Sequence, residues 1–324
     1  MSLLKGSRRS LLISRLIIAL LLVLAALLWR NNTQLEEKLS FLEKHAFSLY
    51  PFAPYVDRNF DFTIDYFGLK YFGNYEEDWP TLYTGAAEKP ELYFLKDAMQ
   101  RTAPQDGVFV DVGANKGGHS LFMSLHSKEV IAYEPYPPVL REFQRMVNEN
   151  NVKNITVRDV GLGAQEDTAT FYIAPDSITT GSFKQGFNKN EKKAGEFKIV
   201  VGDKDLAALG VSRTHLIKID VEGYEKYVLS GLRETLERDR PIVLAELLSF
   251  SKQHNSFQDP TDFKDAFPER YKFYQFDEYN LYTGSYKLAP ADLKKRNRTK
   301  SHGLEIKPRN VVAIPIELES KIFP

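Results

Sequence analysis

Residues 108–120 read VFVDVGANKGGHS, and this stretch decides the fold. An apolar strand runs into an acid, Asp111, and is followed by a turn that contains Gly113, Gly117 and Gly118. In open parallel sheets ligands bind at such turns, because glycine lets the backbone approach a ligand and the next helix N-terminus attracts an anion. Glycine turns after strands are common, so the rest of the chain has to decide what this turn holds.

Strand-like and helix-like segments alternate after residue 88. The expected strands and helices lie at 107–111, 119–126, 129–134, 137–150, 155–159, 216–220, 222–232 and 242–247. Short apolar strands separated by helices are typical of a parallel sheet that is covered on both faces. We therefore predict an α/β protein with a mostly parallel, doubly wound sheet.

Composition narrows the class of protein. The 324 residues are 43% hydrophobic and 27% charged, which is enough to build a large core. The formal net charge is zero, so nothing in the charge balance favours a nucleic-acid partner, and we expect none. Cysteine is absent, which excludes disulfides and thiolate metal sites.

The N-terminus has the pattern of a membrane anchor. The run 11–29 is apolar except for Ser14 and Arg15, and is just long enough to cross a bilayer. Positive charges gather at its N-terminal end, so segment 1–10 is predicted to be a cytosolic tail. A cleaved signal peptide is the alternative. The predicted localisation is a single-pass type II membrane protein, facing the Golgi or ER lumen in a eukaryote or held in the inner membrane of a bacterium.

Two further segments precede the main domain, which we place at 88–324. Residues 30–54 are predicted to form a stem with an amphipathic helix at 33–50, which would permit a weak homodimer. Residues 55–87 form an aromatic-rich N-terminal extension. We expect it to pack on the main domain as short strands, and a stacking surface for a sugar ring is the alternative.

Acids at three successive strand ends indicate what the turn holds. Asp111 would repel a pyrophosphate but attract an ammonium group, and Asn115 replaces the second glycine of the dinucleotide pattern G-x-G-x-x-G. Glu134 is placed to accept the hydroxyls of a ribose, and Asp159 to accept from an adenine amino group. An amino acid, a ribose and an adenine together predict S-adenosylmethionine, and Asn115 disfavours an NAD-dependent oxidoreductase.

Four motifs carry a resemblance to a known family. They are VFVDVGANKGGHS at 108–120, YEPYPP at 133–138, LIKIDVEGYEKYVLSG at 216–231 and IVLAEL at 242–247. With these motifs the chain resembles the FkbM-type methyltransferases over about residues 88–250. The resemblance implies a class I, Rossmann-like methyltransferase fold at 88–324, S-adenosylmethionine as methyl donor, and methylation of an oxygen, often a sugar hydroxyl.

The resemblance also assigns residues. It implies a donor-binding turn that consists of Asp111, Gly113, Asn115 and Gly117, with Ala114 inside it, and it makes Glu134 the ribose acid. Asp220, Glu222 and Gly223 match the family's IDVEG signature.

Three acids are candidates for the chemistry. Asp220, Glu222 and Glu246 follow neighbouring strands and are expected to converge on one pocket. Clustered carboxylates suit a general base for an alcohol, which is a poor nucleophile. They would also suit a divalent cation, but there is no histidine-rich ligand spacing, so we expect no metal. Glu222 has the alternative of simply starting a helix. Thr179 to Phe183, in a long loop, is expected to cover the donor or touch the acceptor.

The sequence thus predicts a membrane-anchored O-methyltransferase, with S-adenosylmethionine and a glycan or glycoconjugate as partners. The alternatives are a methyltransferase of a lipid or small molecule, and a catalytically silent module that keeps the donor pocket.

Overall fold

The computed structural model describes residues 60–323, except for 176, 248–249, 251–255, 295–298, 302–303 and 307–309. The predicted cytosolic tail (1–10), anchor (11–29) and stem (30–54) lie outside the described residues, and so does the homodimer predicted through the stem. Within the described ranges no helix combines the length and the apolar character needed to cross a membrane. This finding corrects the predicted type II membrane localisation, which depended on such a helix.

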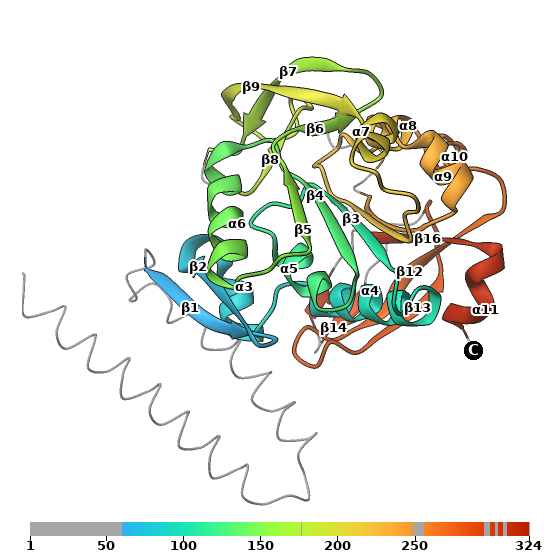
Figure 1. Cartoon of the computed structure of the whole chain (residues 1–324), viewed down its shortest axis with the longest axis horizontal. Coiled ribbons are helices and arrows are strands. Elements are labelled where there is room, and N and C mark those ends of the chain that lie inside the picture. Colours follow the sequence, from blue (N-terminus) through green and yellow to red (C-terminus); the bar gives the residue numbers. More distant parts are fainter. Residues whose placement is uncertain are drawn as a thin grey trace, which may run out of the picture.

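An eight-stranded mixed sheet forms the centre of the molecule, in the order β13-β12-β16-β11-β10-β3-β4-β5 (Figure 1). Its parallel part consists of β3 (Val108–Val112), β4 (Glu129–Tyr133), β5 (Ile155–Arg158), β10 (Leu216–Ile219) and β11 (Ile242–Glu246). Three antiparallel strands complete it: β12 (Tyr271–Tyr279), β13 (Tyr286–Pro290) and β16 (Asn310–Pro315). The predicted α/β class with a parallel centre is confirmed, and the strand order reverses at β3, between β4 and β10.

Helices cover both faces of this sheet because alternate side chains of each strand point to opposite faces. Val110 and Ile217 pack on the side of α7 (Gly202–Ala208), α8 (Glu225–Gly231), α9 (Arg233–Asp239) and α10 (Pro260–Asp265). Phe109 and Leu216 pack on the side of α4 (Lys89–Thr102) and α5 (Gly118–Ser124). The remaining elements of the main domain are α6 (Pro137–Glu149), β14 (Thr299–Ser301), β15 (Leu304–Ile306), η2 (Ile316–Leu318) and α11 (Glu319–Ile322).

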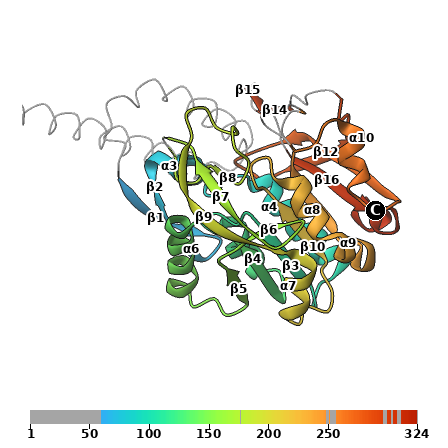
Figure 2. The same ribbon diagram turned by 90° about the horizontal axis from the view of Figure 1, so that it is seen from above.

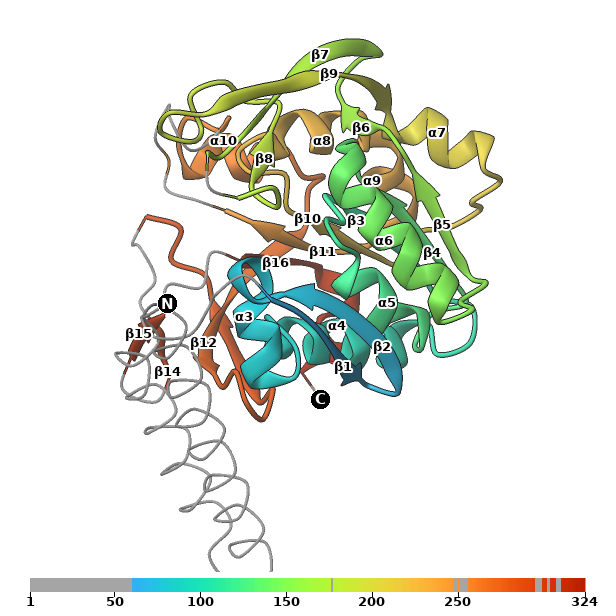
Figure 3. The same cartoon turned by 90° about the vertical axis from the view of Figure 1, so that its left-hand side faces the viewer.

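A second, smaller sheet lies beside the large one, in the order β6-β9-β7-β8. Its strands are β6 (Gly161–Gly163), β7 (Asp167–Ile173), β8 (Gly181–Ser182) and β9 (Lys192–Val201). Leu162 and Val200 join the core on the α8 side of the large sheet. This sheet and the N-terminal hairpin therefore lie on opposite sides of the large sheet (Figure 3).

The N-terminal extension is a hairpin of β1 (Asp61–Tyr66) and β2 (Leu69–Asn74), followed by α3 (Tyr75–Thr84). Tyr66 and Tyr71 are buried in the core that contains α4 and α5, and the ring of Phe67 lies 4.6 Å from that of Phe122. The hairpin runs beside α6 (Figure 2). These rings pack against the main domain, as expected from the interpretation of this segment as short strands that pack there.

Candidate active site

A pocket lies at the carboxyl ends of β3, β4 and β10, where the strand order reverses. It encloses about 670 Å³, including space that is open to solvent. One wall comes from the strand ends of the large sheet, and the other from β6, β7 and the loop around β8. The position is the one at which open α/β sheets bind ligands.

Close approach of two strand ends explains the first glycine of the turn. Gly113 has φ +79°, and a Cβ on it would lie 1.8 Å from the backbone oxygen of Asp220. The N–H groups of Gly113 and Ala114 both donate to the carbonyl of Tyr133 at 3.0 Å. The turn therefore joins the ends of β3, β4 and β10 with no room for a larger residue.

Glu134 and Asn115 form the polar edge of the pocket, and both line it. The Glu134 carboxylate accepts from the backbone N–H of Asn115 at 3.0 Å and from that of Tyr136 at 2.9 Å. Burial raises the pKa of Glu134 to about 7, and the two N–H groups oppose that rise. Each carboxylate oxygen has more than one acceptor position, so Glu134 can also accept from ligand hydroxyls.

Three residues predicted to bind the donor support the turn instead of lining the pocket. Asp111 is completely buried, and its Oδ2 accepts from the Ser120 hydroxyl at 2.6 Å. Ala114 packs in a small cluster with Phe143, and a Cβ on Gly117 would lie 2.1 Å from the Phe143 ring. None of the three is among the residues that line the described pocket, and their part in binding the donor stays a prediction.

Asp159 is also not among the residues that line the pocket. It follows β5, is exposed, and does not belong to the described pocket wall. The wall nearest this part of the chain is apolar and consists of Gly161, Leu162, Phe171 and Phe183. The Phe171 and Phe183 rings meet edge to face with centroids 5.0 Å apart. The adenine contact through Asp159 stays a prediction. Phe171, which lines this apolar wall, was not selected from the sequence.

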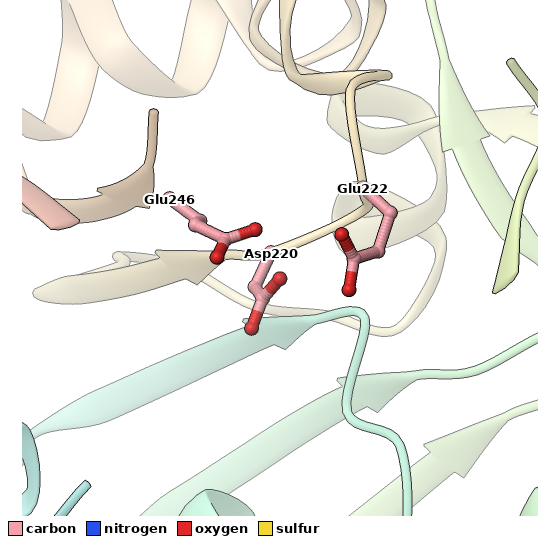
Figure 4. Close-up of side chains that lie close together, drawn as sticks. All are labelled: Asp220, Glu222 and Glu246. Carbon is pink, nitrogen blue, oxygen red and sulfur yellow. The ribbon is translucent and has the colours of Figure 1, made fainter. Parts of the chain in front are cut away.

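The three predicted catalytic acids do come together. Asp220 follows β10, Glu246 ends β11, and Glu222 lies in the turn after Asp220 with φ +53°. One carboxylate oxygen of each lies within 4.8 Å of the others (Figure 4). Asp220 and Glu222 line the pocket, and Glu246 lies beside them. This oxygen-only group could serve as a base or hold a hard cation such as Mg²⁺.

Two buried charged residues that the sequence reasoning did not select support these acids. Glu225 accepts from the N–H groups of Gly223 at 3.0 Å and Val221 at 3.3 Å, so it fixes the turn that follows β10. Burial raises the pKa of Glu225 to about 7. Lys218 lies with its Nζ 3.1 Å from Asp220 Oδ2. A lysine within the apolar run LIKI was the available signal for it.

A loop between β7 and β8 closes one side of the pocket. Ile178 and Thr179 line it, and Thr179 begins the segment 179–183 that the sequence predicts to cover the donor or touch the acceptor. Glu77 on α3 accepts from the Ile178 N–H at 3.1 Å and from the Ser177 and Thr179 hydroxyls at 2.9 Å. Asn115 donates to the Thr179 carbonyl at 2.9 Å. The loop is thus tied both to the N-terminal extension and to the glycine turn.

The fold and the pocket are those of an α/β methyltransferase-like protein, and comparison with known proteins identifies its family. The chain matches the family model "Methyltransferase FkbM domain" over residues 111–282, which is more than half of its length. It therefore belongs to the FkbM methyltransferase family, which confirms the resemblance found in the motifs.

Individual relatives carry related names. "Methyltransferase 1" of Beauveria bassiana is 26% identical over 178 residues, which cover 47% of this chain and 72% of that protein. "Hexuronic acid methyltransferase AglP" of Haloferax volcanii is 25% identical over 188 residues, covering 49% and 75%. The crystal structure of the FkbM methyltransferase from Methylobacillus flagellatus aligns with a TM-score of 0.40 at 15% identity, over 64% of this chain and 43% of that one.

Proposed function

We propose that the protein is an S-adenosylmethionine-dependent O-methyltransferase that acts on a sugar hydroxyl of a glycan or glycoconjugate. One observation carries the proposal: a single pocket wall contains both Glu134 and the pair Asp220 and Glu222. A hydroxyl-binding carboxylate and a group of candidate bases thus border the same space. Membership of a methyltransferase family makes methyl transfer the reaction to expect there.

The pocket fits the proposed donor. Glu134 would accept from the ribose hydroxyls, and the wall of Leu162, Phe171 and Phe183 offers an apolar site for the adenine. Gly113 itself lines the pocket, so its backbone lies where it can contact the donor. When bound, the donor supplies a methyl group that its sulfonium charge already activates.

The chain's own residues have to handle the acceptor. An alcohol becomes a better nucleophile when a nearby base removes its proton, and Asp220 is our candidate for that base. Glu222 and Glu246 lie close enough to Asp220 to accept from neighbouring hydroxyls of a polyol. The 25% identity to a protein named as a hexuronic acid methyltransferase supports a carbohydrate acceptor.

The test is methyl transfer itself. The protein is incubated with methyl-deuterated S-adenosylmethionine and a panel of uronic-acid-containing glycans, neutral glycans, glycolipids and simple lipids, and the products are analysed by mass spectrometry. We expect a labelled methyl ether on a sugar. Labelling of lipids alone would replace the acceptor class, and no labelling of any acceptor at any enzyme concentration would contradict the proposal.

A further inference from the structure

Lys218 is a buried charge in an otherwise apolar strand. The other residues of β10 are Leu216, Ile217 and Ile219, all buried, and Lys218 itself is only 7% exposed. An ammonium group loses much of its hydration on burial, and only well-placed ionic and hydrogen-bonding partners make up for that loss. The groups around Lys218 therefore have to supply such partners.

Three oxygen atoms lie around the Lys218 ammonium group, two as hydrogen-bond acceptors and one as an ion-pair partner. Its Nζ lies 3.1 Å from Asp220 Oδ2, 3.4 Å from the Gly113 carbonyl and 3.9 Å from Asp111 Oδ1. Lys218 is the register partner of Asp111 across the parallel pair β10–β3, and Asp220 follows two residues later on the same face. The sheet register therefore fixes this arrangement.

The contact has an electrostatic consequence. One carboxylate oxygen each of Asp220, Glu222 and Glu246 lies within 4.8 Å of the others, and like charges at such distances repel one another. Burial lowers the pKa of Lys218, but Asp220 and Asp111 outweigh burial and raise it above its ordinary value. Lys218 is therefore a permanent positive charge at the edge of the acid group.

Other titratable groups also face this lysine. His119 on α5 is partly buried. Loss of hydration lowers the pKa of its imidazole, and the positive charge of Lys218 lowers it further. Glu88, which precedes α4, adds negative charge from the side of the N-terminal extension and lies 3.8 Å from His119 Nε2. A neutral His119 leaves Lys218 as the nearby cation that acts on Asp220.

We propose that Lys218 is a positioning residue for methyl transfer: its ammonium group binds Asp220 Oδ2, which orients the carboxylate, places a positive charge beside it and leaves the other oxygen for the acceptor hydroxyl. The inference rests on the proposed function. In the reaction, the hydroxyl oxygen bonds to the methyl carbon while the carbon–sulfur bond breaks and leaves its electron pair on sulfur. The hydroxyl proton passes to Asp220.

The test compares Lys218→Met, which keeps length but removes charge, with Lys218→Arg, which keeps charge. The readouts are kcat and KM, the pH profile of kcat, and the Kd of S-adenosylhomocysteine by calorimetry. For Lys218→Met we expect kcat to fall about 100-fold at pH 7. The acidic limb of the pH profile of kcat should move up by about one pH unit, and the Kd of S-adenosylhomocysteine should change less than about threefold. Lys218→Arg should return the limb to its wild-type position.

Matched variants separate this role from a loss of fold. Lys272→Met removes an exposed lysine that pairs with Glu319, and should change none of the three readouts. Lys218→Met leaves the buried Asp111 carboxylate without its cation, and this could unfold the variant. In that case the double variant Asp111→Asn/Lys218→Met, which also removes the Asp111 charge, is measured in place of the single variant. The same upward movement of the limb is expected.

Two outcomes overturn the inference. A loss of kcat with the limb unmoved would make Lys218 a purely structural residue, and a limb that Lys218→Arg does not restore would exclude its charge as the cause. If the wild-type protein turns over its substrate and the variants give either of these results, only the role of Lys218 is contradicted. A wild-type protein without any turnover contradicts the proposed function as well.

Discussion

The side-chain amide of Asn115 donates a hydrogen bond to the carbonyl oxygen of Thr179 at 2.9 Å, across 64 residues of sequence. This bond fastens the loop that closes the pocket to the turn that begins at Gly113. Glu77, from the N-terminal extension, holds the same loop from the other side. The cover of the pocket thus depends on three segments that are far apart in the chain.

The first prediction concerns this cover. Glu77→Ala removes three hydrogen bonds to the loop, each worth about 1 kcal/mol net, and only part of that loss should reach the ligand. We expect the Kd of S-adenosylhomocysteine to rise about tenfold, measured by calorimetry. Glu76→Ala, at the exposed neighbouring position, is the control and should bind normally. Equal affinity of both variants would show that the loop does not hold the ligand.

The second prediction concerns the glycine turn. Gly113 and Gly186 have nearly the same φ, +79° and +80°, but only at Gly113 would a Cβ collide with backbone. Gly186→Ala should cost about 1 kcal/mol of unfolding free energy from its φ alone. Gly113→Ala should cost clearly more and abolish binding of S-adenosylhomocysteine. Denaturant unfolding compares the two, and equal costs would contradict the close approach to Asp220.

The third prediction separates two acids at strand ends. Asp220→Asn should lower kcat about 100-fold and change the Kd of S-adenosylhomocysteine less than about threefold, because Asp220 is proposed to act on the acceptor proton. Asp159→Asn should change neither, since Asp159 is exposed and does not line the pocket. Steady-state kinetics with calorimetry distinguish these cases. A parallel loss of turnover and binding in Asp220→Asn would make it a donor-binding or structural residue.

The fourth prediction concerns metal. Lys218 already places a positive charge 3.1 Å from Asp220, so the acid group has a cation of its own. We expect the rate of methyl transfer after dialysis against EDTA to stay within about twofold of the rate before dialysis. The reason is that no step assigned to these residues needs a Lewis acid. The assay is repeated with added Mg²⁺ or Mn²⁺. A rate that disappears on dialysis and returns with either ion would show that the three carboxylates bind metal.

Much of the site follows from one property of parallel sheets. Because parallel strands end at the same edge, acids that follow successive strands come together, and Asp220, Glu222 and Glu246 do. The same reasoning does not apply to Asp111, because this residue lies within β3 and not after it. Its carboxylate accepts a hydrogen bond from the Ser120 hydroxyl on α5. Position along a strand was predictable, but the packing of Asp111 against α5, which keeps its side chain out of the pocket lining, was not.

Other parts of the site depend on contacts that no local pattern reveals. The wall containing Phe171 and Phe183 comes from the second sheet, and its approach to the pocket is set by strand pairing over long distances in the chain. Glu77 reaches its loop across about 100 residues. The hydropathy of 11–29 predicted a membrane localisation, but that run lies outside the described part of the chain, in which no helix could cross a membrane.

The last prediction tests the central claim that this pocket binds the nucleoside of the methyl donor through Glu134. Burial raises the pKa of this carboxyl to about 7, so it is mostly ionised at pH 8 and mostly protonated at pH 6. Only the ionised form accepts fully from two ribose hydroxyls, so affinity should fall as the pH falls through 7.

The decisive measurement is calorimetric titration of the protein with S-adenosylhomocysteine at pH 8 and pH 6. We expect binding that is about tenfold weaker at pH 6, as the ionised fraction of a group with that pKa requires. Glu134→Gln should bind at least about tenfold more weakly at pH 8, with no dependence on pH across this range. No heat of binding at pH 8, or equal affinity in the wild-type protein and Glu134→Gln, would contradict the account.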